Sequence, residues 1–246
     1  MKILVCISKV PDTTTKISFK EDNTRFNDEN VQWILNPTDE WYALVRALEL
    51  KEKLGGTVTV IHVGKADSDP VIRKALALGA DDAVRIDAEP ADSYFTGAQI
   101  AEYARGKGFD IIFTGKETIS YNGFMVGGVI AELLQLPFVS LASSLDMEGT
   151  TATIRREIEG GKEAVKVSAP FVVSATKGIA EPRIPNMRGI MSAKTKPLAV
   201  VQPAEVPQFT FIKSYELPPQ RQSVKLVKPE NISELVDLLH NEAKII

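Results

Sequence analysis

The sequence predicts an α/β protein built on a mainly parallel, doubly wound sheet. Up to about residue 140, short apolar runs alternate with segments of helical periodicity, and glycines or prolines separate most of them. This alternation is typical of parallel strands joined by helices that cover both faces of a sheet. After that point two strand-like runs flank a glycine-rich turn, and a long aperiodic stretch leads to a final helical pattern. We therefore expect an added β-hairpin and an extended C-terminal arm that ends in a helix.

The first elements have clear boundaries. Residues 3–8 form an apolar run, and a helix is expected from Thr38, as a cap, to the Gly55–Gly56 pair. Within it Trp41, Leu44, Val45 and Leu48 recur at the spacing of one helix face. Further strands are expected at residues 57–63, 83–86, 111–114 and 138–140, and further helices at residues 68–79, 97–105 and 127–134.

The second half is organised differently. Residues 144–156 and 162–167 are expected to be two strands of a hairpin that turns at Glu159-Gly160-Gly161, and residues 171–175 another strand. Residues 176–222 show little periodicity and predict an interaction arm. Apolar residues at helical spacing over 232–239 then predict a terminal helix. That helix packs either on another chain or back on its own sheet, and the pattern does not decide between the two.

Composition excludes several classes of function. The 246 residues carry a net charge of −3 and include one cysteine, Cys6. We expect no nucleic-acid partner, no membrane insertion, no disulfide within the chain and a cytoplasmic location. The only two histidines, His62 and His240, are far apart in the sequence, and no cluster has the spacing of metal ligands. His62 is expected to be structural, no metal site is expected, and the chain is expected not to be an enzyme by itself.

A ligand site is expected at the carboxyl ends of the strands. In open α/β sheets, ligands bind there, near the point where strand order reverses. Here the strand ends are Cys6, Val63 and Gly115, and the last is followed by a long loop with glycines and then a helix. Free backbone N–H groups at the start of that helix form an anion site. Loops of this kind also occur without any ligand, so both possibilities stay open at this point.

A second feature is the proline-broken segment at residues 181–191. It carries Ile184, Met187, Ile190 and Met191, with Arg183, Arg188 and Lys194 close by. If exposed, it forms an adaptable apolar contact surface with a basic rim. The alternative is a loop that packs against the core.

Four motifs together resemble the beta subunits of electron transfer flavoproteins over essentially the whole chain. They are ILVCISKVPD at residues 3–12; Asn36-Pro37 followed by RKALALGAD at 73–81; Gly115-Lys116-Glu117; and REIEGGKE at 156–163, followed by PFVV at 170–173, EPR at 181–183 and GIMSAK at 189–194. The resemblance implies an adenine-nucleotide alpha-hydrolase-like fold and a heterodimer whose alpha subunit holds most of a shared FAD.

The resemblance also implies a bound AMP, in a pocket where some relatives hold a second FAD instead. The residues that match this pocket are Cys6, Asn36, Pro37, Thr38, Asp39, Val63, Gly115, Lys116, Glu117, Ser120, Asn122, Gly123, Met125 and Val126. The chain departs from the family in two places. Many members carry a D-x-D-x-x-Q pattern where this chain has residues 120–125, and two positions often aromatic near the flavin are Thr13 and Thr38.

The segment at 183–194 is similar to the family's recognition loop, which docks on partner dehydrogenases. Its expected docking residues are Met187, Arg188, Ile190 and Met191, and Glu157 matches an acid that pairs with the alpha subunit near the flavin. The implied partners are the alpha subunit, acyl-CoA or other dehydrogenases of fatty acid oxidation, and a quinone oxidoreductase. We expect residues 1–200 to be the nucleotide-binding domain and residues 201–246 an arm and helix on the partner subunit.

A different class of protein remains as an alternative. A stand-alone nucleotide-binding regulator, similar to universal stress proteins, would share this α/β pattern. The long arm and the apolar segment around Met187 argue against it, because a self-contained sensor has no use for either.

Overall fold

The computed structural model describes residues 1–220 and 224–246. Its strands are β1 (Lys2–Cys6), β2 (Lys9–Pro11), β3 (Phe19–Lys20), β4 (Arg25–Phe26), β5 (Trp33–Leu35), β6 (Thr57–Val63), β7 (Asp82–Ile86), β8 (Ile111–Gly115), β9 (Phe138–Glu148), β10 (Thr151–Ile158), β11 (Gly161–Ser168), β12 (Phe171–Ala175) and β13 (Leu198–Val201). Its helices are α1 (Asp39–Leu54), α2 (Asp69–Leu78), α3 (Ser93–Ala104), α4 (Val126–Leu134), α5 (Met187–Ala193) and α6 (Ile232–Asp237), with short 3₁₀ turns η1 (Ala66–Ser68) and η2 (Pro229–Asn231) and the π-helical η3 (Leu238–Glu242).

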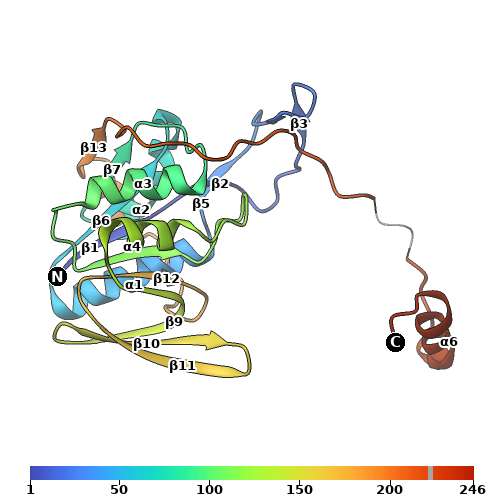
Figure 1. Ribbon diagram of the computed structural model, residues 1–246. Helices are drawn as coiled ribbons and strands as arrows, with labels where there is room; N and C mark the ends of the chain where they lie inside the picture. The colour runs from blue at the N-terminus through green and yellow to red at the C-terminus, as the bar shows by residue number, and fades with distance from the viewer. Residues whose placement is uncertain (221–223) are drawn as a thin grey trace. The chain divides into compact units, whose positions relative to one another are not determined.

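One large sheet organises the domain. Its strand order is β11-β10-β9-β12-β8-β1-β6-β7-β13, and every pair from β9 to β13 in that order is parallel (Figure 1). Only β10 and β11 run antiparallel to their neighbours. The chain moves from β1 outward through β6 to β7 and then returns to β8 on the other side of β1. The switch point of the sheet therefore lies between β1 and β8.

Two apolar layers cover the sheet. Alternate residues of β1 point to opposite faces, so Ile3 and Val5 join the core under α1 and α2, while Leu4 joins the core under α3 and α4. All three are fully buried. The predicted doubly wound α/β class is confirmed. Within the part of the chain that the structure describes, none of the helices combines the length and apolar character needed to cross a bilayer.

The hairpin addition is longer than the sequence pattern predicts. The expectation of one strand over residues 144–156 is wrong, because the chain turns at Gly149 and forms β9 and β10 on either side. Gly149 has a φ of +60°, which glycine adopts without steric cost. The result is a three-stranded antiparallel extension with Thr151 paired to Glu148 and, at the next turn, Ile158 to Gly161.

The stretch expected to lack structure contains two elements. Helix α5 forms within it, capped by the Asn186 side chain, and β13 adds a parallel edge strand to β7. Both are too short for a periodic signal, and tertiary contacts hold them. Residues 221 and 222, at the end of the expected stretch, lie outside the described residues.

The segment after β13 is fastened across α3. Gln99 donates to the carbonyl of Ala204 and accepts from its N–H, both at 2.8 Å. Asp92 caps α3 through Phe95 and also accepts from the N–H groups of Phe209 and Thr210 at 2.8 Å. Residues 202–210 therefore belong physically to the α/β domain.

The chain divides into two compact units. The larger unit is Met1–Ile17 with Asn27–Lys213, and the smaller is Ser18–Phe26 with Ser214–Ile246. In the smaller unit the rings of Phe19 and Tyr215 stack at 4.8 Å, and the N–H of Tyr215 donates to Asn23. The predicted terminal helix is present as α6 followed by η3.

Helix α1 offers a matched test of the core. Leu44→Ala removes a side chain that is 0% exposed, whereas Leu54→Ala changes one that is 41% exposed on the same helix. We expect the first to lower the free energy of unfolding by about 2–5 kcal/mol, through lost burial and the cavity that remains. The second should cost less than about 1 kcal/mol. Urea denaturation followed by circular dichroism measures both, and equal losses would contradict this packing.

Candidate functional site

Three of the predicted site residues lie where neighbouring strands end. Cys6, Gly115 and Val63 close β1, β8 and β6, which are adjacent in the sheet. Cys6 and Val63 are buried in the apolar layer under α3 and α4. Burial, and secondarily the Glu40 carboxylate, raise the pKa of the Cys6 thiol, so the thiol stays protonated and unreactive. The strand ends form an apolar floor.

Polar contacts join the start of α1 to the loop that follows β8. The Asn36 amide donates to the carbonyl of Glu117 at 3.0 Å, and Asp39 accepts from the Glu117 N–H at 3.3 Å. Lys116 donates its N–H to the carbonyl of Ala175 and pairs with the Glu117 carboxylate at 2.9 Å. The predicted residues at the start of α1 and after β8 are therefore in contact with one another, although they are about 80 positions apart.

The start of α1 concentrates buried carboxylates. Burial raises the pKa of Asp39, and Lys116 opposes that shift. Glu40 is also buried and accepts from the N–H of Ser8 at 2.5 Å and from its hydroxyl at 2.8 Å. Burial raises the pKa of Glu40 to about 7, against the lowering effect of these hydrogen bonds. Thr38 does not cap α1 with its side chain, which donates to the Asn36 side chain instead.

The start of α4 has the character of an anion site. No side chain caps this helix, and its first turn contains no acid. Val126, Gly127 and Gly128 begin the helix, and the N–H of the next residue is the first to bond within it. Below this turn the Thr114 hydroxyl is buried without a hydrogen-bond partner among the described residues. A Cβ on Gly127 would lie 2.8 Å from that hydroxyl oxygen, so only glycine fits there.

The loop between Gly115 and the start of α4 is held by local hydrogen bonds. The N–H of Asn122 donates to the carbonyl of Thr118 at 2.9 Å, and Asn122 itself has a φ of +51°. Ser120 and Met125 are exposed, while Gly123 and Val126 are half-buried. A Cβ on Gly123 would approach the hydroxyl of Ser93 on α3 to 3.0 Å. The loop therefore follows the start of α3 closely.

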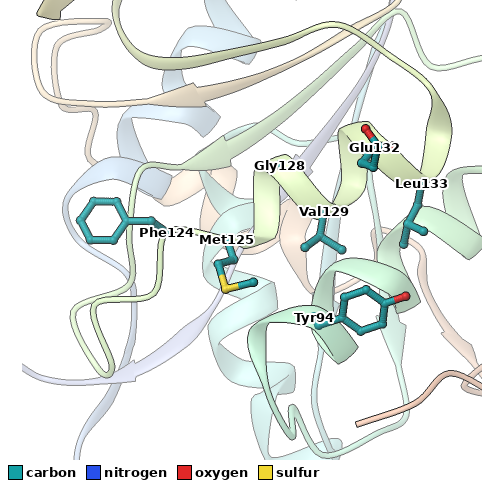
Figure 2. A pocket seen from close by; sticks show the side chains of 7 residues that line it. All are labelled: Tyr94, Phe124, Met125, Gly128, Val129, Glu132 and Leu133. Carbon is teal, nitrogen blue, oxygen red and sulfur yellow. The ribbon is translucent and has the colours of Figure 1, made fainter. Parts of the chain in front are cut away.

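A groove that the sequence did not indicate lies beside this loop. Figure 2 shows Tyr94 of α3 next to Val129 and Leu133 of α4, with Met125 at the start of α4. Together with Phe124, Gly128 and Glu132 they line a cavity of about 360 Å³. The edge of the Phe209 ring packs on Tyr94 at 4.6 Å. No local periodicity reveals this groove, because its two walls come from separate helices.

These residues fit a nucleotide better than a metal or a covalent reaction. The uncapped helix start suits a phosphate, and the carboxylates of Asp39 and Glu117 suit donors such as hydroxyls or an exocyclic amine. His62 donates through Nδ1–H to the carbonyl of Ile7 at 2.9 Å, and burial lowers its pKa to about 4. It is the neutral structural histidine that the sequence predicts.

The predicted docking residues lie elsewhere on the domain. Met187, Arg188, Ile190 and Met191 are on α5, which packs on α2 with Gly189 against the Ala77 carbonyl. All four side chains are exposed, while the backbone of α5 packs against α2 and Ala193 at its end joins the core.

Glu157 is separate from these four residues. It lies on β10, at the antiparallel end of the sheet, and is 3.6 Å from Lys162 across the hairpin. Helix α5 instead packs on α2, which contacts β6 and β7.

Comparison with known proteins establishes the family. The model for the electron transfer flavoprotein domain matches residues 24–206. The chain is 35% identical to the electron transfer flavoprotein subunit beta of Bacillus subtilis, with 100% of both chains covered. The chain belongs to the electron transfer flavoprotein beta-subunit family. It is also 32% identical to the human subunit beta, over 100% of this chain and 99% of the relative.

Another relative has a different printed name. The acryloyl-CoA reductase electron transfer subunit gamma of Anaerotignum propionicum is 32% identical, with 82% of this chain and 77% of the relative covered. Members of this family are electron carriers, and the names of all three relatives denote subunits. The family membership therefore favours a carrier subunit over the stand-alone regulator.

Sequence reasoning missed two residues at the site. In the sequence pattern, Glu40 falls only within the helix expected from Thr38, and Thr114 only within the strand expected at residues 111–114. Each gains its character from a distant segment: Glu40 from Ser8, and Thr114 from Gly127 above it. No signal in the neighbouring sequence indicates either contact.

Glu40 should make stability depend on pH. Its pKa of about 7 in the folded chain lies above its ordinary value of 4.5. Its contribution to stability is therefore fully present below about pH 4.5 and is lost as the pH rises through about 7. We expect Glu40→Gln to flatten the fall in unfolding free energy between about pH 5 and about pH 8, because an amide cannot ionise. Urea titrations at several pH values measure this.

Glu52→Gln is the control for that experiment. The hydrogen bond from Arg183 lowers the pKa of Glu52, so this side chain contributes with the opposite sign. The fall in unfolding free energy with rising pH should persist in Glu52→Gln. An equal fall in Glu40→Gln would show that Glu40 is not the group that causes this pH dependence.

Proposed function

We propose that this chain is the beta subunit of a heterodimeric electron transfer flavoprotein that carries electrons from dehydrogenases to a quinone oxidoreductase or another acceptor. The observation that supports this most directly is family membership over the full chain, together with an α/β domain whose apolar α5 faces solvent. Acyl-CoA dehydrogenases of fatty acid oxidation are the proposed donors, and the cytoplasm is the proposed location.

The chain's own residues would act by position and electrostatics. A FAD held mainly by the alpha subunit supplies the electron transfer chemistry when the complex is formed. The α/β domain gives the alpha subunit a rigid platform, and the arm and α6 would pack on it. Helix α6 presents Ile232, Leu235 and Val236 as exposed apolar side chains, which suits burial against a second chain. Glu157 would pair with a basic residue of the alpha subunit.

The strand-end site would hold AMP. Its phosphate would lie at the start of α4, against the N–H groups of Val126, Gly127 and Gly128. The residues at the start of α1 and in the 115–126 loop would contact the nucleoside. The family's D-x-D-x-x-Q pattern is absent, so the backbone would supply most of the contacts. A second FAD in the same pocket is the alternative ligand.

Purification of the complex tests the proposal. Co-expression with the flavin-bearing subunit should give a yellow heterodimer whose flavin is reduced by an acyl-CoA dehydrogenase with its substrate. A colourless homodimer that holds a nucleotide would contradict it and would favour the stand-alone regulator.

The docking role gives a sharp prediction for α5. We expect Met187→Ala to raise the KM for an acyl-CoA dehydrogenase by roughly tenfold, because a central apolar anchor contributes at least 1–2 kcal/mol to docking. Flavin content and heterodimer formation should not change. Stopped-flow reduction measures the rate, with Val200→Ala as a control at an exposed apolar residue of β13. A wild-type KM in Met187→Ala would exclude the docking role.

The phosphate position gives a second prediction. Gly128→Asp puts a carboxylate in the first turn of α4, where it would repel a phosphate and occupy the free N–H groups. We expect the AMP content of the purified complex to fall by about tenfold or more, equivalent to about 1.4 kcal/mol. Gly128→Ala adds only a methyl group, in ordinary contact with Phe138, and should retain AMP. Mass spectrometry of ligand released by acid measures both, and equal contents would count against this site.

A further inference from the structure

The apolar segment that carries Met187 is exposed in its side chains but fastened in its backbone. Ile184, Met187 and Met191 are 89%, 73% and 67% exposed. The chain before and after them is bonded to α1 and α2, and Gly189 between them packs closely on α2. The side chains of this segment are therefore exposed while the backbone that carries them is fixed.

The first anchor holds Arg183 on α1. Its guanidinium makes two bonds to the Glu52 carboxylate, at 2.6 and 2.8 Å, in the bidentate geometry of an arginine–carboxylate pair. Its carbonyl accepts from the indole N–H of Trp41 at 3.1 Å. Lys74 of α2 lies over the Trp41 ring at 5.2 Å and holds the indole in place. The chain therefore enters the exposed segment in a fixed direction.

The second anchor lies inside the segment. The Asn186 side chain accepts from the N–H of Gly189 at 2.8 Å and starts α5. A Cβ on Gly189 would lie 2.3 Å from the carbonyl oxygen of Ala77, a backbone atom of α2 that cannot move aside cheaply. Glycine thus lets α5 approach α2 more closely than any other residue would permit.

The third anchor holds the exit. Arg73 of α2 donates to the carbonyls of Ala193 and Lys196 at 2.7 and 2.6 Å. Lys196 donates in turn to the carbonyls of Leu76 and Ala80 at 2.9 and 2.5 Å. Its ammonium lies at the carboxyl end of α2, where a helix attracts positive charge.

These anchors reduce the cost of binding. A flexible loop must be ordered when it docks, and each side chain immobilised then weakens the complex, whereas an ordered loop has no such cost. Exposed ion pairs contribute little to the stability of a fold. The Arg183–Glu52 pair is at such an exposed position, so its effect is expected on the conformation of the segment more than on the fold.

We propose that Arg183, Glu52 and Gly189 are positioning residues that hold the Ile184–Met187–Met191 surface in the conformation in which it binds a dehydrogenase. The proposal rests on the docking role proposed above for α5. It assigns to these three residues a function in electron transfer that they perform by fixing the backbone of the segment.

A charge exchange tests the first anchor in the flavin-containing complex. Arg183→Glu should raise the KM for an acyl-CoA dehydrogenase about tenfold and leave kcat unchanged, because the segment must then be ordered on docking. Hydrogen exchange should become faster at the N–H groups of Gly189 and Ile190, which are bonded to Asn186. The double variant Glu52→Arg with Arg183→Glu restores the ion pair with its charges swapped. It should return both KM and the hydrogen-exchange rates to wild-type values.

Gly189→Ala tests the second anchor independently of charge. The added methyl group should displace α5 from α2 and raise KM at constant kcat, with faster exchange in residues 186–193. Gly161→Ala is the matched control, since a Cβ there has nothing within 4 Å. The Gly161→Ala variant should retain the wild-type KM and wild-type hydrogen-exchange rates.

The outcomes separate this proposal from the docking role. The positioning proposal would be overturned if KM and hydrogen exchange were unchanged in both Arg183→Glu and Gly189→Ala. It would also be overturned if the double variant failed to restore KM and hydrogen exchange to their wild-type values. If Met187→Ala itself leaves KM unchanged, the docking role fails. Hydrogen exchange then decides alone. Faster hydrogen exchange in Arg183→Glu that the double variant reverses supports positioning, and unchanged hydrogen exchange refutes it.

Discussion

Burial of β1 on both faces and along both edges is the constraint on which the rest of the domain depends. Ile3, Leu4 and Val5 are fully buried, and β1 pairs with β6 on one side and β8 on the other. A strand in this position must be apolar wherever it is buried, as Ile3 to Cys6 are, and parallel neighbours bring helices over both faces. The carboxyl ends of β1, β6 and β8 then lie together. The switch point, and with it the candidate nucleotide site, follows from that arrangement.

Polar bonds convert the shared strand ends into a defined site. Asn36 and Asp39 fix the backbone of Glu117, and Glu40 fixes that of Ser8. The loop after β8 is thereby held against the start of α1, while the start of α4 keeps its N–H groups available. Carboxylates thus gather on one side of the site and backbone donors on the other. This separation of acceptors and donors matches the two ends of a nucleotide.

The same principle of a fixed backbone and available groups applies to α5. Its apolar side chains are exposed, and Arg183, Gly189 and the contacts of Arg73 fasten the chain beneath them to α1 and α2. Both proposed surfaces therefore use α1 as a support. The candidate nucleotide site takes the start of α1, whereas the proposed docking surface takes its end near Glu52. A change in the packing of α1 would affect both.

The sequence by itself determined the fold class, the order of strands and helices and the family, because apolar periodicity and the ILVCISKVPD and GIMSAK motifs are local signals. Only the tertiary structure decided that β9 and β10 are separate strands, that α5 and β13 form, and which distant segments Glu40, Thr114 and Arg183 contact. Each of these depends on a partner far away in the chain, such as Ser8 for Glu40 or Glu52 for Arg183. Short-range patterns carry no information about such contacts, because folding alone brings the partners together.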